Sequence, residues 1–259
     1  MTELNALSNI LDDLGIRAWQ YFPTAPSTND LALTWAEEGA ADGSLVIADT
    51  QTAGRGRSGR QWVTRPGAAL AFSLVLRPSA AEAIYVTRFT ALAALSLVQA
   101  LSVFGLKAEL KWPNDVLLMR KKVAGILVET NWQDGRIDAL VVGIGVNVLP
   151  ESVPDKGSLR YPATSVSDAL EKPVDRWQLL GEILRSLQAF RLLLTGAEFI
   201  QAWNAHLAMR GEWVQFLLPG NDPLRMRTIE VSHDGSLILE GEDGTRISAI
   251  EGEIVMIGE

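Results

Sequence analysis

Hydrophobic positions recur with helical spacing in some stretches of the chain and with strand spacing in others. Over residues 3–14 they recur every three or four positions, which predicts an amphipathic helix that ends at Gly15. Ser27 precedes Asp30 by three residues, a capping-box arrangement that predicts a second helix, continuing to about Glu38. Further helices are predicted at 80–104, 174–194 and 198–207, and strands at 17–22, 44–49, 70–76, 107–112, 116–119, 123–132 and 137–148.

The middle of the chain predicts a sheet with a helix packed under it. The stretch 80–104 is apolar all round, which is typical of one long buried helix, and Gly105 ends it. Strand patterns dominate over residues 107–148, and Asp134 and Gly135 mark a hairpin turn between the last two strands. We therefore expect the sheet to be mixed and mostly antiparallel.

The end of the chain has a different pattern. Short β segments separated by turn pairs fill residues 212–257, which predicts a small barrel that begins near Gly211. The overall expectation is an α+β fold, in which residues 1–210 form a catalytic domain with helices flanking the sheet. Residues 211–259 are expected to form a small C-terminal β-barrel domain.

Composition narrows the class of protein. The chain has 259 residues, 47% hydrophobic and 21% charged, which is typical of a compact globule. The N-terminal stretch carries acids and lacks the basic start and apolar run of a signal peptide, so a cytoplasmic location is expected. No apolar stretch reaches the roughly 18 residues that span a bilayer. Cysteine is absent, which excludes disulfides and acyl transfer through a thiol.

The charge distribution predicts a local anionic ligand. Net charge is −8, from 23 cations and 31 anions, so a general nucleic-acid surface is not expected. With only two histidines and no second ligand near either one in sequence, no metal site is predicted. The cations are nevertheless clustered: Arg55, Arg57, Arg60 and Arg65 lie in one short window, and Lys111, Arg120, Lys121 and Lys122 in another.

The first window contains the stretch GRGRSGR, residues 54–60. Its glycines let backbone amides approach an anion and its guanidiniums suit phosphate or carboxylate. The glycine spacing imitates a Walker loop, but Arg60 and Gln61 replace the Lys-Ser/Thr pair, so a P-loop is excluded. A solvated flexible loop without a ligand remains an alternative.

The second window surrounds the stretch KWPND, residues 111–115. Its proline forces an extended residue and a turn, which places Asn114 and Asp115 at a strand end. Asp115 either only stabilises the turn or supplies a carboxylate that takes a proton or orients a reacting group. Lys122 opens the next strand and is either a solvated strand end or a fixed cation, and Gly125 suggests close backbone approach.

Two glycines, Gly143 and Gly145, interrupt an apolar strand that ends at Asn147. They indicate either something large lying against the strand or a bulge without a ligand. Trp62 follows the arginine loop and either fills the core or stacks on a base.

Five stretches in this order resemble the biotin-protein ligase family: STN at Ser27, QTAGRGRSGRQW from Gln51, KWPND from Lys111, KVAGILVE from Lys122 and GIGVN from Gly143. The later stretches DGSLILE and EGEI resemble that family's C-terminal domain, so the resemblance covers nearly the whole chain. It implies a fold like that of class II aminoacyl-tRNA synthetases and biotin ligases. The implied reaction joins biotin and ATP into biotinyl-5′-AMP and pyrophosphate, with Mg²⁺ accompanying ATP, and then transfers biotin to a lysine.

The resemblance also implies roles for individual residues. The residues expected to bind biotin are Ser27, Thr28, Asn29, Gln51, Gly54, Arg55, Arg57, Lys122, Gly125 and Gly143. Those expected on the ATP and adenylate side are Arg57, Arg60, Trp62, Asn114, Lys122 and Asn147. Lys122, Arg55 and Asp115 are the expected catalytic residues, with Asp115 as the candidate base for the acceptor lysine.

The implied partner is the biotin carboxyl carrier protein domain of a biotin-dependent carboxylase. A homodimer is a further possibility in this family, whereas a DNA-binding role is not expected because only 26 residues precede Ser27. Two alternatives stay open: a lipoate-type ligase, and a carrier-binding module without catalysis.

Overall fold

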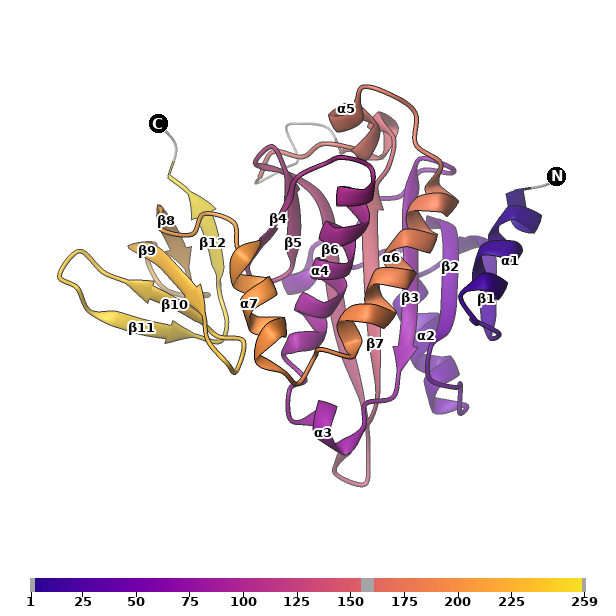
Figure 1. Ribbon diagram of the computed structural model, residues 1–259, viewed down its shortest axis with the longest axis horizontal. Helices are drawn as coiled ribbons and strands as arrows, with labels where there is room; N and C mark the ends of the chain where they lie inside the picture. Colours follow the sequence, from indigo (N-terminus) through magenta and orange to yellow (C-terminus); the bar gives the residue numbers. More distant parts are fainter. Residues whose placement is uncertain (1–2, 155–160, 258–259) are drawn as a thin grey trace.

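The computed structural model describes residues 3–154 and 161–257, which form two sheets and the helices around them (Figure 1). The larger sheet has seven strands in the order β1-β2-β3-β7-β6-β5-β4. Its strands are β1 Trp19–Ala25, β2 Ser44–Gln51, β3 Ala69–Leu76, β4 Ala108–Lys111, β5 Asp115–Leu118, β6 Lys121–Gln133 and β7 Arg136–Asn147. Only β1 and β2 pair in parallel, so the expected mixed, mostly antiparallel sheet flanked by helices is confirmed.

Helices cover both faces of this sheet. Helices α4 (Arg88–Val103) and α6 (Arg176–Arg191) pack together on one face, and α1 (Glu3–Asp13) packs on α6. Helix α2 (Thr28–Glu37) lies on the opposite face, against β2, β3 and β7. Its residues Ala32 and Ala36, with Ala40 just after the helix, form a separate small core with Val46, Val75 and Val141.

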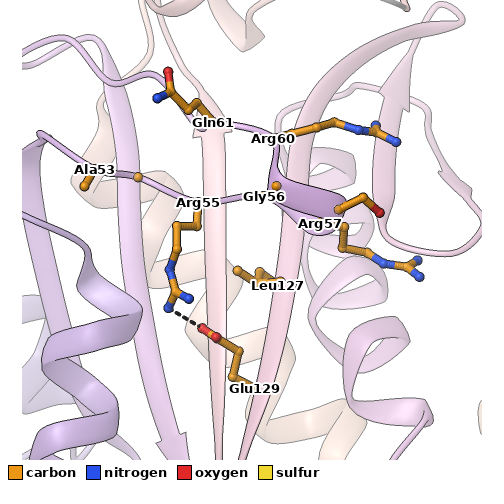
Figure 2. Close-up of a pocket in the computed structure, with 11 residues that line it drawn as sticks. Ala53, Arg55, Gly56, Arg57, Arg60, Gln61, Leu127 and Glu129 are labelled. Carbon is orange, nitrogen blue, oxygen red and sulfur yellow. Dashed lines mark hydrogen bonds and ion pairs between the residues drawn. The ribbon is translucent and has the colours of Figure 1, made fainter.

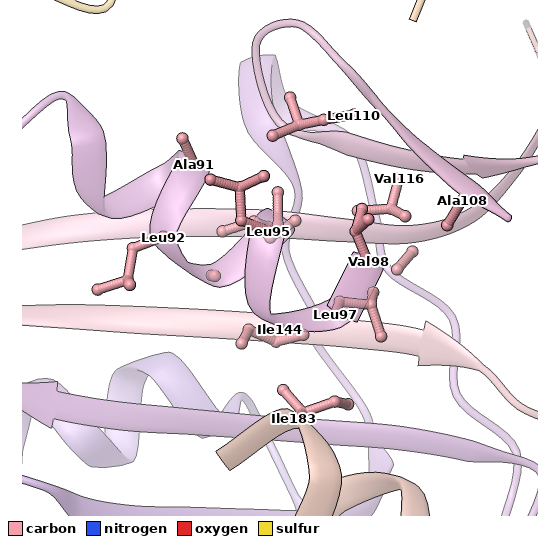
Figure 3. Packing of buried hydrophobic residues seen from close by; sticks show 14 of the residues in the cluster. Ala91, Leu92, Leu95, Leu97, Val98, Ala108, Leu110, Val116, Ile144 and Ile183 are labelled. Atoms are coloured by element: carbon pink, nitrogen blue, oxygen red, sulfur yellow. The ribbon is translucent and has the colours of Figure 1, made fainter. Parts of the chain in front are cut away.

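The main core lies between α4, α6 and the sheet. Figure 3 shows Leu92, Leu95 and Val98 of α4 directed toward strand residues such as Val116 and Ile144. Every second residue of β7 from Leu140 to Val146 belongs to this core, so the intervening residues face α2. Those intervening residues include Gly143 and Gly145, which places the glycines on the face away from the main core.

The prediction of one helix over 80–104 is wrong. The structure has a short helix, α3 (Ala80–Ala83), whose N-terminus is capped by a capping box of Ser79 and Glu82. A turn follows before α4 begins at Arg88. The reason lies far along the chain, because Thr87 donates to the Asp234 carbonyl and the Arg88 side chain donates to the His233 carbonyl. Local periodicity carries no signal of these contacts. The sequence also gave no expectation of the helices α5 (Val166–Leu170) and η2 (Pro150–Ser152).

The C-terminal part is an open sheet, and the predicted closed barrel is wrong. After α7 (Ala197–Ala205), five antiparallel strands run in the order β11-β10-β9-β8-β12. They are β8 Trp213–Leu217, β9 Leu224–Val231, β10 Leu237–Glu240, β11 Arg246–Ala249 and β12 Glu253–Met256. No pairing joins β11 to β12 among the described residues, so the edges stay apart. The apolar face of this sheet joins the main core through residues such as Phe216 and Leu237, and it needs no closure to bury them.

None of the helices in the described part of the chain has the length and apolar character needed to cross a membrane.

Candidate active site

A polar site lies on the α2 face of the large sheet, where the start of α2, the loop 52–66 and strands β6 and β7 meet. Ser27 caps α2 by accepting a hydrogen bond from the Asp30 amide at 3.5 Å, as its spacing predicted. The cap places Thr28 and Asn29 in the first turn, and both side chains are buried.

A continuous row of hydrogen bonds crosses this face. The Thr28 amide and hydroxyl both donate to Gln51 Oε1, at 2.8 and 3.1 Å. The Ser73 hydroxyl lies 2.8 Å from Thr28 Oγ1 and 2.6 Å from Asn29 Oδ1. Asn29 Nδ2 then donates to Glu129 Oε2 at 2.8 Å and to the Leu127 carbonyl at 3.2 Å. The row ties four elements together and holds Asn29 by both ends of its amide.

The two glycines of β7 make room for protein side chains. A Cβ on Gly143 would overlap Asn29 Oδ1, and a Cβ on Gly145 would overlap the Trp62 indole. On the neighbouring strand, a Cβ on Gly125 would come within 3.3 Å of Trp62 Cζ3 and 3.2 Å of Lys122 Nζ. Something large does lie against this strand, as the glycines indicated, and it includes Asn29 and Trp62.

The arginine loop is more ordered than a plain flexible connection. Residues 57–59 form a 3-10 turn with Ser58 at a φ of 56°, and Arg55 bridges to Gln61 across the loop. Arg55 Nη2 forms ion pairs with Asp30 and, at 2.9 Å, with Glu129. The loop thereby encloses a pocket of about 660 Å³ together with Leu127 and Glu129 (Figure 2).

The other two arginines of the loop differ in their partners. Arg60 Nη2 pairs with Glu253 of β12 at 2.5 Å, which links the loop to the C-terminal sheet. Arg57 has no side-chain hydrogen bond or ion pair with any residue that the structure describes. Figure 2 shows its guanidinium directed away from the Arg55–Glu129 pair, so Arg57 is a cation available to a ligand.

Lys122, which is partly exposed, and the buried Asp115 form an ion pair at the other end of the site. Lys122 Nζ lies 2.5 Å from Asp115 Oδ1, and Lys111 Nζ lies 3.6 Å from Asp115 Oδ2. Lys122 Nζ also lies 5.8 Å from the centre of the Trp62 ring. The buried Trp62 Nε1 has no acceptor among the described residues, which makes it a donor that a ligand could satisfy.

The asparagines expected on the adenylate side are tied to backbone. Asn114 Nδ2 donates to the Ile126 carbonyl at 2.8 Å, and the Ile126 amide returns a bond to the Asn114 carbonyl at 2.9 Å. Asn147 Nδ2 donates to the Thr164 carbonyl at 3.2 Å, and the Thr164 amide donates to the Lys122 carbonyl. Both asparagines therefore lie beside the strand that carries Lys122.

The predicted residues gather on one face of the sheet, but Arg55 and Lys122 lie at separate ends of it. Arg55 lines the pocket with Glu129, whereas Lys122 lies near Gly125. The Trp62 ring packs against Gly125 of β6 and Gly145 of β7. Asn29, expected to bind biotin, has protein hydrogen-bond partners at both ends of its side-chain amide. The roles of all these residues in binding and catalysis stay predictions.

Sequence reasoning missed several residues that build the site. Ser73 and Glu129 complete the hydrogen-bonded row, and Glu253 reaches the loop from β12. A serine inside the apolar strand ALAFSLVL was a usable signal for Ser73. For Glu253 there was none, because it pairs with Arg60 across 193 positions.

No cluster of three or more histidine, aspartate or glutamate side chains that could hold a metal ion occurs in the described residues.

Comparison with known proteins points to one family. The sequence profile of the biotin/lipoate A/B protein ligase family matches residues 21–147. The biotin–(acetyl-CoA-carboxylase) ligase of Paracoccus denitrificans is 34% identical, over 85% of this chain and 93% of its own. The enzyme of the same name from Mycobacterium tuberculosis is 31% identical, over 98% and 99%. A biotin protein ligase from Aquifex aeolicus, solved with biotin and ATP, superimposes with a TM-score of 0.78 at 27% identity, over 93% and 98%.

Proposed function

The chain belongs to the biotin/lipoate A/B protein ligase family, and we propose that it joins biotin to ATP and then transfers the biotinyl group to a carrier lysine. In the first step the biotin carboxylate attacks the α-phosphorus of ATP, which gives biotinyl-5′-AMP and pyrophosphate. In the second, the lysine amine displaces AMP from the mixed anhydride. The observation that supports this most directly is Lys122, a cation paired with Asp115 beside Gly125 and Trp62.

The first step brings a carboxylate to a triphosphate, so negative charge must be neutralised where the two meet. Lys122 is suited to the carboxylate and α-phosphate because Asp115 fixes its Nζ. Arg57, whose side chain has no hydrogen bond or ion pair with the residues that the structure describes, is suited to the phosphates or the adenylate. Arg60 pairs with Glu253 at the loop edge and is suited to offer its remaining guanidinium N–H groups to a phosphate while it keeps that partner.

Biotin itself occupies the side of the site near Gln51 and Thr28 in this proposal. Their mutual hydrogen bonds fix both groups in place, so little side-chain freedom is lost when the ureido ring binds. Asn29 acts through Glu129 and Ser73 and so supports this end of the pocket. Arg55, paired with Asp30 and Glu129, anchors the loop that covers the intermediate and excludes water.

Mg²⁺ is proposed to arrive with ATP. The described residues offer no carboxylate cluster for a resident ion. A magnesium ion held mainly by phosphate oxygens and water fits that observation, and it would supply charge neutralisation at the phosphates.

The second step needs an acceptor lysine that has lost its proton. Asp115 is the nearest carboxylate to Lys122, but two lysines hold its two oxygens. We therefore propose that the main role of Asp115 is to orient Lys122. Removal of the proton from the acceptor lysine by Asp115 stays a prediction. The proposed acceptor is the carrier domain of a biotin-dependent carboxylase, and pairing with a second copy of the chain also remains a proposal.

Pyrophosphate exchange into ATP, measured with biotin and with lipoate in separate reactions, tests the function. Exchange that depends on biotin is the expected result. Exchange with lipoate alone would replace the proposal by a lipoate ligase, and binding of a carrier domain without exchange would indicate a non-catalytic module.

A further inference from the structure

We infer that Glu253 of β12 is a positioning residue for the ligation reaction, because it joins the arginine loop to Lys122 through a row of five alternating charges. The row runs Arg60, Glu253, Lys111, Asp115, Lys122. This inference rests on the proposed function, since it concerns how the same site is held in order.

The centre of the row is a buried lysine. Lys111 ends β4, and only 1% of its side chain is exposed. Its Nζ lies 3.3 Å from Glu253 Oε1 and 3.6 Å from Asp115 Oδ2, and 5.1 Å from the centre of the Tyr161 ring. A buried cation needs such partners, because an unpaired charge in this environment is strongly unfavourable.

Glu253 divides its carboxylate between two elements. Oε1 accepts from Lys111, while Oε2 accepts from Arg60 of the loop at 2.5 Å. Burial alone would raise the pKa of Glu253, but attraction to Lys111 and the bond from Arg60 hold it below its usual value. The residue is therefore a fixed anion supplied by the C-terminal sheet.

The row couples the loop to the catalytic lysine by charge. Asp115 faces Lys111 with one oxygen and Lys122 with the other. If Glu253 loses its charge, Asp115 is the one anion among the described residues that still pairs with Lys111, and we expect Asp115 to be drawn away from Lys122. Arg60 simultaneously loses its anchor, so both the loop and Lys122 shift from their positions.

Glu253→Gln is the test, because glutamine keeps the shape and removes the charge. We expect biotin-dependent pyrophosphate exchange at saturating ATP to fall by about 10- to 100-fold and the KM for ATP to rise, as for other residues that orient a site. Glu253→Asp keeps the charge and should retain more activity than the glutamine variant. A role in packing alone would give the reverse order, since glutamine is the closer match in shape.

Glu212→Gln is the matched control. Glu212 also joins the C-terminal part to the large sheet, through a two-bond ion pair with Arg120 at 2.9 and 2.6 Å, but lies outside the row. Equal losses in the Glu212 and Glu253 variants, or wild-type kinetics in Glu253→Gln, would overturn the inference. The melting temperatures of both variants show whether the C-terminal sheet has lost its contact with the large sheet, as distinct from a shift of the loop and Lys122.

Tryptic cleavage after the loop arginines gives a readout that does not depend on activity. Cleavage after Arg60 in the ligand-free protein should become about tenfold faster in Glu253→Gln and stay near wild type in Glu212→Gln, because proteolysis follows the opened population. Unchanged cleavage would also overturn the inference. Absence of biotin-dependent exchange in the wild-type chain would instead contradict the proposed function, and the cleavage result would still stand.

Discussion

Lys122 is held between an anion and an aromatic ring, and each contact serves a different purpose. Asp115 fixes the position of Nζ, and the face of Trp62 lies 5.8 Å from it. The Lys122 side chain retains partial access to solvent, with 23% of it exposed. A phosphate or carboxylate can therefore reach Lys122 without displacing the protein around it.

Lys122→Ala should abolish adenylate formation while leaving the fold intact. Loss of one fixed charge at an electrostatic site typically costs about 10²–10³ in rate, and Asp115 retains Lys111 as a partner. The measurement is single-turnover formation of biotinyl-AMP, with circular dichroism for the fold. Lys121→Ala is the control, because Lys121 is an exposed neighbour on the same strand. Near-normal adenylation in Lys122→Ala would remove Lys122 from its role.

At the residue scale, the charged residues of the site could be predicted from the sequence, but several of their partners could not. Lys122, Asp115 and the loop arginines could be singled out because the cations cluster in two short windows and the stretches around them resemble the biotin-protein ligase family. Glu129 could not, since it lies inside a strand and meets Asn29 across 100 positions. Its role depends on which strands are neighbours, which no local pattern states.

The loop 52–66 is the element whose geometry matters most. Its glycines differ in surroundings: a Cβ on Gly54 would overlap the Trp62 carbonyl and come within 2.9 Å of Gln51 Nε2, whereas a Cβ on Gly56 would meet nothing closer than 3.6 Å. Gly56 has an extended backbone, with φ of −123°, so alanine fits there without strain.

Gly54→Ala should weaken biotin binding, and Gly56→Ala should not. Overpacking costs typically about 1–3 kcal/mol, which corresponds to about 5- to 150-fold in affinity. The alanine at position 54 must displace either Gln51 or the backbone at Trp62, both of which belong to the proposed biotin side. Calorimetric titration with biotin measures the two variants. Equal biotin affinities of the Gly54→Ala and Gly56→Ala variants would mean that the loop rearranges freely and that position 54 does not require glycine.

At the element scale, sequence predicted most strands and their turn well. The hairpin at Asp134 and Gly135 is a clear case, because both residues adopt a positive φ that only such turn residues tolerate easily. The prediction of one long helix is wrong before Arg88, because contacts with the distant turn at residues 233–234 determine where α4 begins. Closure of the barrel failed for the same reason, since the C-terminal sheet buries its apolar face against the rest of the protein.

A buried arginine, Arg88, is one of the residues that join the two parts of the molecule. Arg88, 0% exposed, donates to the His233 carbonyl at 2.7 Å and to the Leu194 carbonyl at 2.6 Å. It also lies 4.0 Å from the centre of the Tyr85 ring. Burial lowers the pKa of Arg88, yet a guanidinium stays charged over the physiological range. Carbonyl dipoles and an aromatic face thus replace a carboxylate partner.

This junction predicts that the whole chain unfolds in one transition, although residues 211–259 were expected to form a domain of their own. The apolar residues of the C-terminal sheet belong to the same core cluster as α4 and α6, so melting one part exposes the other. Differential scanning calorimetry should give a calorimetric enthalpy equal to the van't Hoff enthalpy. A separate early transition for the C-terminal sheet would contradict the prediction.

Arg88→Met should lower that single melting temperature by about 6–12 °C, because leaving the carbonyls unpaired costs about 3 kcal/mol and each kcal/mol shifts a chain of this size by about 2–4 °C. Arg88→Lys should recover only part of the loss, since one ammonium cannot reach carbonyls on both sides of the junction. Arg210→Met is the control, because Arg210 also donates to carbonyls, of Ile229 and Asn204, but lies exposed. Equal shifts for the Arg88→Met and Arg210→Met variants would mean that burial at the junction contributes nothing.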